Sequence, residues 1–195
     1  MGSQLPDGEP MPSDGALPTG HRGRRGVDLG FYLHVPFCAT RCGYCDFNTY
    51  TPDELGGADS LMERWRRGIH AEIDLATRVL ADSEPRPIKT IFVGGGTPSL
   101  VPASWLVDFV DHLEDAFGIG AGAEITTEAN PESTVPSWLD ELHRGGFTRL
   151  SLGMQSTSTK VLQLLERRHT PGRPADVVAA ARAIGFTDIS LDLIM

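Results

Sequence analysis

The sequence lacks any long hydrophobic run. No apolar segment approaches the roughly 20 residues that a helix needs to cross a bilayer. The N-terminus also lacks the basic start and the apolar stretch of a secretory signal. We therefore predict a protein without a transmembrane segment and expect it to be cytoplasmic.

Cysteine is scarce, because the 195 residues contain only Cys38, Cys42 and Cys45. A disulfide framework usually has an even number of cysteines spread along the chain, so this odd and crowded set argues against one. Three thiols on one short segment instead favour a metal site.

Positive charge is also in short supply. The chain has 17 Lys and Arg against 26 Asp and Glu, a formal net charge of −9, which argues against nonspecific binding of nucleic acid. Gly and Pro are concentrated in residues 1–26, where acidic and basic residues balance. We predict a disordered Gly/Pro-rich tail over residues 1–28 and a folded core over residues 29–195.

Strand-like and helix-like segments alternate through the core. Predicted strands cover residues 29–35, 89–93, 124–128, 148–152 and 188–194. Predicted helices cover residues 60–80, 103–117, 137–144, 159–167 and 175–184. This α/β order builds parallel βα units, in either an open doubly wound sheet or a barrel. In both architectures functional residues gather at the C-terminal ends of the strands.

The last predicted strand runs directly into Ile194 and Met195, with no turn or cap. We expect from this that a larger protein has been truncated after about five βα units, with a C-terminal domain absent. We also expect Leu191, Leu193 and Ile194 to face the barrel interior without their partners.

The three cysteines follow the spacing CxxxCxxC. Thiolates at this spacing on one tight loop can each bind a different iron of a cubane cluster, leaving the fourth iron open to a small molecule. The alternative is a zinc site completed by His34 or Asp46, since zinc accepts a Cys₃His set. A second knuckle-like ligand pair is missing from the sequence, so we favour the cluster.

The loop from Tyr32 to Asn48 reads YxHxPFCxxxCxYCDFN. This string resembles the radical S-adenosylmethionine (SAM) superfamily, in the branch that contains oxygen-independent coproporphyrinogen III oxidase and the HemW-type haem chaperones. The resemblance implies a partial parallel (βα) barrel and a 4Fe-4S cluster on the three cysteines. SAM would bind the open iron, and Tyr32 and Tyr44 belong to the shared motif.

The resemblance extends to later strand ends and implies further SAM-binding residues. These are Gly95, Gly96 and Thr97 in GGGTPS, Glu128 in EANPE, Gln155, Arg167 and Asp192. From the residues alone, the glycines could form a tight turn, and Arg167 or its neighbour Arg168 could be a solvated helix-end cation. A helix N-terminal charge suits Glu132 better than Glu128, and Asp192 could be a polar barrel-layer residue.

Two functions are compatible with the resemblance. The oxidase-like motif has a further cysteine two residues after the third, where this chain has Phe47, so we predict the haem chaperone form. The alternative is coproporphyrinogen III oxidase, in which a radical derived from SAM starts oxidative decarboxylation. Expected partners are haem or porphyrinogen, a haem-acceptor protein and an electron donor for the cluster. We do not expect His34 or His169 to ligate haem, because the family's haem-binding segment lies downstream.

Overall fold

The computed structural model describes residues 12–13, 27–51, 58–81, 86–167 and 170–194. Its elements, in chain order, are β1 (Leu29–Val35), α2 (Ala58–Leu80), β2 (Ile88–Gly95), the short 3₁₀ turn η1 (Pro98–Leu100), α3 (Ala103–Phe117), β3 (Ile119–Ala129), α4 (Pro136–Arg144), β4 (Arg149–Gln155), α5 (Thr159–Leu164), α6 (Arg173–Ile184) and β5 (Asp188–Leu193). Most of the predicted tail, residues 1–11 and 14–26, lies outside the described residues.

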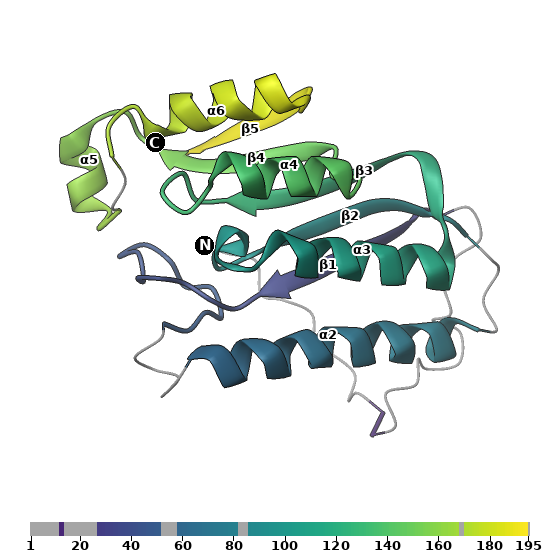
Figure 1. The fold of residues 1–195 in the computed structure, drawn as a ribbon. Coiled ribbons are helices and arrows are strands. Elements are labelled where there is room, and N and C mark those ends of the chain that lie inside the picture. The colour runs from purple at the N-terminus through teal and green to yellow at the C-terminus, as the bar shows by residue number, and fades with distance from the viewer. Residues whose placement is uncertain (1–11, 14–26, 52–57, 82–85, 168–169, 195) are drawn as a thin grey trace.

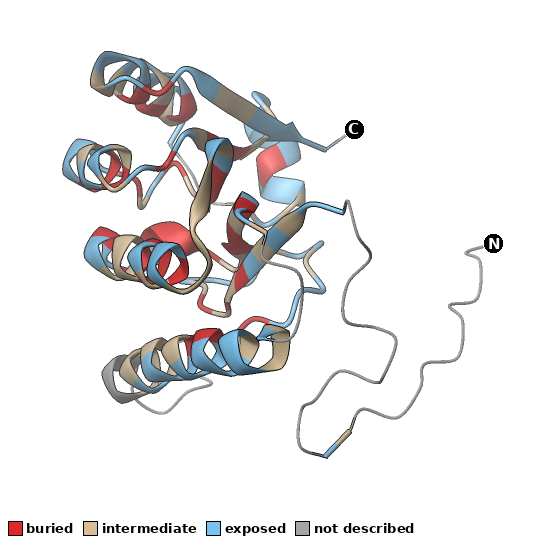
Figure 2. Cartoon of the chain, turned by 90° about the vertical axis from the view of Figure 1, so that its right-hand side faces the viewer, coloured by how far each residue is buried: buried red, intermediate tan, exposed pale blue. Residues whose placement is uncertain are grey.

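The five strands form one parallel sheet in the order β1-β2-β3-β4-β5 (Figure 1). A doubly wound sheet reverses its strand order and carries helices on both faces. Here the order follows the chain, and α2, α3, α4 and α6 lie along the same face of the sheet (Figure 2). This arrangement is part of a (βα) barrel, which decides between the two predicted architectures.

The hydrophobic core lies between the sheet and these four helices (Figure 2). Its most deeply buried Leu and Ile side chains are Ile88, Ile91, Leu106, Leu113, Leu139, Leu142, Leu150 and Leu152. They come from the helix stripes and from the alternate strand positions that the sequence predicts to be apolar. Because the core covers one face of the sheet, the alternate strand residues point to the other face, the open face.

Polar side chains occupy the open face near the strand ends. Ser151 donates a hydrogen bond to Asp192 (3.1 Å), and Ser190 donates one to Ser151 (2.9 Å). Leu191 pairs in register with buried Leu152, so it lies on the helix-covered side, and Leu193 follows two positions later. The expectation that Leu191 and Leu193 face the barrel interior was therefore wrong, since strand alternation places Ser190 and Asp192 there.

Helix α5 ends earlier than predicted, at Leu164 rather than Arg167. Glu166 adopts a left-handed conformation (φ 53°), and the amide of Arg167 donates to the carbonyl oxygen of Leu162 (2.8 Å). These are the features of a Schellman motif, which usually has glycine at the left-handed position. The turn takes Arg167 off the helix and toward the end of β4, where it contacts Gly153.

None of the described helices contains an apolar stretch long enough to cross a membrane.

Candidate functional site

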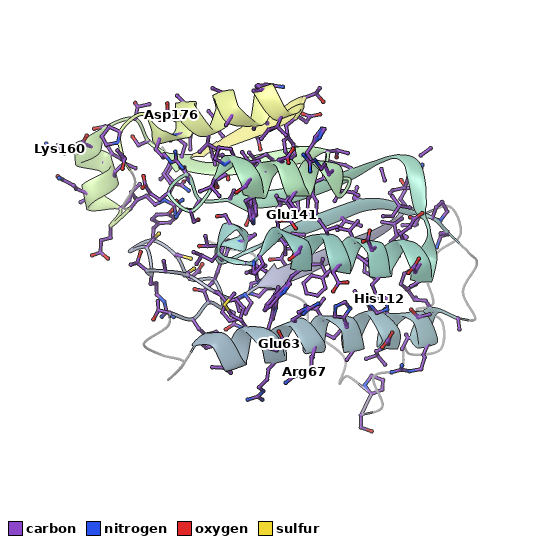
Figure 3. All side chains as sticks on the ribbon, in the orientation of Figure 1. Glu63, Arg67, His112, Glu141, Lys160 and Asp176 are labelled. Carbon is purple, nitrogen blue, oxygen red and sulfur yellow. The ribbon has the colours of Figure 1, made fainter. Side chains whose placement is uncertain are left out.

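A cavity of about 340 Å³ lies at the C-terminal ends of the strands. The loop after β1 and the ends of β2, β3, β4 and β5 all contribute to its wall. Its lining includes every predicted site residue except Tyr32: Cys38, Cys42, Tyr44, Cys45, Gly95, Gly96, Thr97, Glu128, Gln155, Arg167 and Asp192. Sulfur atoms gather at this end of the sheet in Figure 3.

The cysteine loop is fastened at both ends by main-chain hydrogen bonds. The amide of Cys38 donates to the carbonyl oxygen of Tyr50 (3.0 Å), and the amide of Tyr50 donates to that of Pro36 (2.7 Å). Within the loop, the amide of Cys45 donates to the carbonyl oxygen of Cys42 (3.1 Å). The turn that carries the three thiols is thus built by the backbone and leaves the side chains available.

All three cysteines are free thiols of intermediate exposure. The hydroxyl of Thr97 lies 3.7 Å from the sulfur of Cys38, and Nη1 of Arg167 lies 3.5 Å from the sulfur of Cys42. Both groups donate hydrogen bonds to the sulfur atoms. The thiolate is the form that ligates metals.

Tyr44 lies among these thiols. Burial raises the pKa of its hydroxyl to about 12, although the positive charge of Arg167 lowers it and the Cys42 and Cys45 thiols raise it further. The side chain is therefore a neutral phenol at physiological pH, able to donate a hydrogen bond inside the cavity.

His34 uses both ring nitrogens for structural hydrogen bonds. Its Nε2 lies 2.9 Å from the carbonyl oxygen of Asn48, and its Nδ1 lies 2.9 Å from the hydroxyl of Tyr32. A carbonyl only accepts, so Nε2 carries the proton and Nδ1 accepts from Tyr32. His34 thus connects β1 to the cysteine loop, and Tyr32 points to this histidine instead of lining the cavity.

The arrangement differs from a mononuclear zinc site. Within the described ranges, no three His, Cys, Asp or Glu side chains are grouped closely enough to hold one ion. Four ligands of one zinc ion stand within about 2.0–2.3 Å of a common centre, whereas a cubane distributes its cysteines over separate irons.

The glycine-rich turn after β2 is packed against the start of the cysteine loop. The amide of Gly96 donates to the carbonyl oxygen of Val35 (2.7 Å), and the amide of Thr97 donates to that of Phe37 (2.7 Å). A Cβ at Gly96 would lie 2.5 Å from the Phe37 oxygen, so only glycine fits this close approach. The amides of Gly96 and Thr97 are therefore bonded within the protein.

Glu128 and Asp192 form the acidic wall of the cavity. Oε2 of Glu128 accepts from the amide of Gly95 (3.0 Å). Burial raises the pKa of Glu128 above its usual range, the Gly95 hydrogen bond opposes this, and the charge of Asp192 adds to the rise. Two neighbouring carboxyl groups in a partly buried site favour a cationic ligand, because a positive charge relieves their repulsion.

Arg167 forms the basic wall. Its Nη2 donates to the carbonyl oxygen of Gly153 (2.9 Å), and its Nε is a buried nitrogen for which the described residues provide no hydrogen-bond partner. A Cβ at Gly153 would lie only 2.7 Å from Nη2, so the glycine makes room for the guanidinium. The structure thus places Arg167 in the cavity wall rather than at a solvated helix end, while Arg168 lies outside the described residues.

Gln155 lies in the wall of the cavity, whereas Glu132 lies outside it. Gln155 ends β4 in a left-handed conformation (φ 65°), which is uncommon for a residue other than glycine, and it lines the cavity. Glu132 lies outside the lining and accepts a hydrogen bond from the amide of Thr170. The helix N-terminal role considered for Glu132 is not seen, because the first turn of α4 contains no acidic residue.

Several lining residues were not predicted from the sequence. Arg41 and Asn130 contribute to the cavity wall, as do Thr40 and Thr49. Arg41 and Thr40 lie between two predicted ligands, and Asn130 follows Glu128 by two positions, so proximity in the sequence was the available signal. Ile194, which we expected to face the barrel interior, lines the cavity, and its amide donates to the carbonyl oxygen of Gln155 (3.0 Å).

Known proteins resemble this chain in sequence, and a solved structure resembles it in fold. The heme chaperone HemW of Mycobacterium tuberculosis (strain ATCC 25618 / H37Rv) is 49% identical over 169 residues, covering 87% of this chain and 42% of that protein. The heme chaperone HemW of Escherichia coli (strain K12) is 34% identical over 165 residues, covering 85% of this chain and 42% of that protein. The chain thus spans about two fifths of the length of these relatives.

A solved structure gives the same result for the fold. Coproporphyrinogen III oxidase (HemN) from Escherichia coli, described as a radical SAM enzyme, superposes with a TM-score of 0.73 at 29% identity. The match covers 85% of this chain and 37% of that one. The family model for the radical SAM superfamily matches residues 32–195. The chain therefore belongs to the radical SAM superfamily, a membership that implies a 4Fe-4S cluster and SAM as cofactors.

Proposed function

We propose that Cys38, Cys42 and Cys45 hold a 4Fe-4S cluster and that SAM occupies the adjoining cavity. The observation that carries this proposal is the gathering of three free thiols, an acidic wall and a basic wall around one cavity at the strand ends. When bound, the cluster and SAM supply one-electron chemistry at the sulfonium group. The residues of the chain bind, orient and shield these groups.

The charges of the two walls suit the two ends of SAM's methionine part. Glu128 and Asp192 together favour a positive group such as an ammonium. Arg167 offers a guanidinium whose buried Nε has no hydrogen-bond partner among the described residues, and guanidinium groups pair with carboxylates through two parallel hydrogen bonds. We assign Gln155, Gly95, Gly96, Thr97 and Tyr44 as further parts of the binding wall. Tyr32 acts indirectly, because it holds His34 in the orientation that supports the cysteine loop.

For the whole protein we propose a haem chaperone that binds haem and delivers it to an acceptor protein in the cytoplasm. Support comes from the HemW relatives and from Phe47, which lines the cavity where the oxidase-like motif has a cysteine. The phenyl ring of Phe47 has no donor atom, so it can neither ligate iron nor replace a thiol there. An electron donor for the cluster is a further partner that this proposal requires.

Coproporphyrinogen III oxidase activity is the second candidate. It is favoured by the similarity to the solved HemN structure, with which this chain is 29% identical over 85% of its length. In that case the partner would be a porphyrinogen instead of haem, while the roles of the cysteines and of Arg167 would be the same.

The test of the whole-protein function uses the gene product that contains this sequence, at its full encoded length. After anaerobic reconstitution with iron and sulfide, haem binding is measured by absorbance titration. Conversion of coproporphyrinogen III is measured under reducing conditions with SAM. We expect haem to bind and no porphyrinogen product to form. Multiple turnovers without haem binding would overturn the chaperone proposal in favour of the oxidase.

A further inference from the structure

Two histidines face each other between α2 and α3, outside the cavity. Nδ1 of His70 lies 2.9 Å from Nδ1 of His112, and the two rings are stacked with centroids 5.1 Å apart. Figure 3 shows His112 on the side of α3 that faces α2. The geometry points to a binding site for a divalent transition-metal ion, with these two Nδ1 atoms as its protein ligands.

The hydrogen bonds at the far side of each ring decide where the protons are. Nε2 of His70 lies 3.0 Å from Oδ2 of Asp108, and Nε2 of His112 lies 3.1 Å from Oδ1 of Asp74. Hydrogen bonding from Arg66 lowers the pKa of Asp108, which keeps this group a carboxylate that only accepts. Each Nε2 therefore donates to its carboxylate, which leaves the two Nδ1 atoms facing each other at 2.9 Å to share a proton or to bind a metal ion.

Two Nδ1 atoms at 2.9 Å are joined either by a proton on one ring or by a metal ion bound to both. A carboxylate that accepts from the outer nitrogen of a histidine is also the usual support of a metal-binding imidazole, because it fixes the ring's tautomer and orientation. Here both histidines have this support, one from each helix. Two carboxylates contact the outer ring nitrogens, and one of them, Asp108, also accepts from Arg66 (3.0 Å).

The separation of the two nitrogens indicates which ion fits. At the usual metal–nitrogen distance of about 2.0–2.1 Å, a 2.9 Å separation gives an angle of about 90° at the ion. This angle belongs to neighbouring positions of square-planar or octahedral coordination, which Cu²⁺ and Ni²⁺ adopt with nitrogen and oxygen ligands. No third side-chain ligand joins the pair within the described parts of the chain. Water completes the coordination, because the side chains of His70 and His112 are 29% and 27% exposed.

The test is an isothermal titration of Ni²⁺ into the chain after iodoacetamide has alkylated its three cysteines, so that thiolates do not compete. We expect one Ni²⁺ per chain, and an affinity at least tenfold weaker in His70→Gln and in His112→Gln. The matched control is His143→Gln, because His143 lies on α4, where it packs against Phe186. This variant should bind Ni²⁺ with unchanged affinity. A thermal melt of each variant without metal shows whether it is folded.

A second readout works on the unsubstituted histidines. Cu²⁺ bound to the alkylated chain should give an electron paramagnetic resonance (EPR) spectrum with hyperfine splitting from two nitrogens. If the alkylated chain binds no metal ion, or if His70→Gln and His112→Gln bind it as tightly as the native chain, the proposal is wrong. A proton shared by the two rings would then explain their close contact. The test does not depend on the cluster, so it stands or falls separately from the proposed function.

Discussion

At the scale of single residues, Arg167 links the cysteine loop to the end of β4. Its guanidinium contacts Cys42 and the carbonyl oxygen of Gly153, and the space for it depends on the missing side chain at Gly153. One arginine therefore contacts both a proposed cluster ligand, Cys42, and the wall of the cavity.

Arg167→Lys should weaken SAM binding to the reconstituted protein about 10- to 100-fold. The reason is the loss of a paired, charge-assisted hydrogen bond worth roughly 1.5–3 kcal/mol. Gly153→Ala should act in the same direction, because its Cβ would lie 2.7 Å from Nη2 and displace the guanidinium. Equilibrium binding of SAM measures both variants. Arg144→Lys is the control, since Arg144 forms an exposed ion pair with Asp140, and an equal loss there would contradict the assignment.

Glu128 should make the stability of the chain depend on pH. Its pKa in the folded state is raised by burial and by Asp192, so the folded chain favours the protonated form more than the unfolded chain does. Its contribution is fully present below the ordinary carboxyl pKa of 4.5 and is lost as pH rises through the raised value. Urea unfolding at several pH values should show this loss in the native chain and not in Glu128→Gln. Parallel pH profiles for the two proteins would contradict the account.

The positions of the candidate site residues were predictable because each lies in a short sequence motif at the end of a predicted strand. Cys38, Cys42 and Cys45 needed only their spacing, while Arg167 needed the resemblance to be preferred over Arg168. The role of Gly96 was harder to foresee, because a glycine required by a ligand and one required by a neighbouring carbonyl look the same in sequence. The Phe37 oxygen that excludes a side chain at Gly96 comes from 59 positions earlier in the chain.

At the scale of elements, the close contact between the turn after β2 and the loop after β1 positions the cysteines. Gly96→Ala should destabilise the fold by about 1–3 kcal/mol, because a backbone oxygen 2.5 Å from the new Cβ cannot move freely. The variant should also retain less cluster after reconstitution, since Cys38 follows Phe37 directly.

The matched control for this glycine is Gly68→Ala, within helix α2. A Cβ at Gly68 meets nothing within 4 Å, and alanine is favoured over glycine inside a helix by about 0.5–1 kcal/mol. The free energy of unfolding, measured in urea, should therefore fall in Gly96→Ala and rise in Gly68→Ala. The same sign for both variants would show that local packing does not explain the effect.

Helix ends were predictable where glycine terminates the helix. Helices α3, α4 and α6 end before Gly118, Gly145 and Gly185, as predicted. Helix α5 ends through the same type of hydrogen bonding with Glu166 in the left-handed position, which the sequence does not reveal. The difference between the predicted and observed end of α5 matters, because the turn after Leu164 places Arg167 in the wall of the cavity.

At the scale of the whole molecule, β5 is an edge of the described sheet and carries exposed apolar side chains. Leu191 is 44% exposed and Leu193 is 62% exposed. Adjacent apolar side chains on an edge strand favour contact with other apolar surfaces.

The 195-residue chain should therefore bind a hydrophobic fluorescent dye, and Leu193→Lys should reduce the fluorescence. Leu164→Lys on α5 is the control, since Leu164 is more exposed, at 84%, but does not belong to this edge. We expect a smaller decrease from the control, because isolated apolar side chains bind such dyes weakly. A larger decrease from the control would contradict the role of the β5 edge.

The alternation of strands and helices was sufficient to predict parallel βα units. It was insufficient to separate a doubly wound sheet from a barrel, because both have the same order of elements along the chain. The difference lies in which strands become neighbours and in the face that the helices cover, and both depend on packing between distant segments. Similarly, the prediction for Leu191 and Leu193 failed because β5 alternates polar and apolar residues, and only the pairing with β4 assigns the faces.

The central claim is that the three cysteines hold a 4Fe-4S cluster with one iron open to SAM. The direct measurement is anaerobic reconstitution with iron and sulfide, followed by metal analysis and EPR of the reduced protein with and without SAM. We predict four irons per chain, a cluster signal that changes when SAM is added, and loss of the signal in each of Cys38→Ala, Cys42→Ala and Cys45→Ala. One zinc and no iron in anaerobically prepared protein, or a full cluster in the triple alanine variant, would contradict the account.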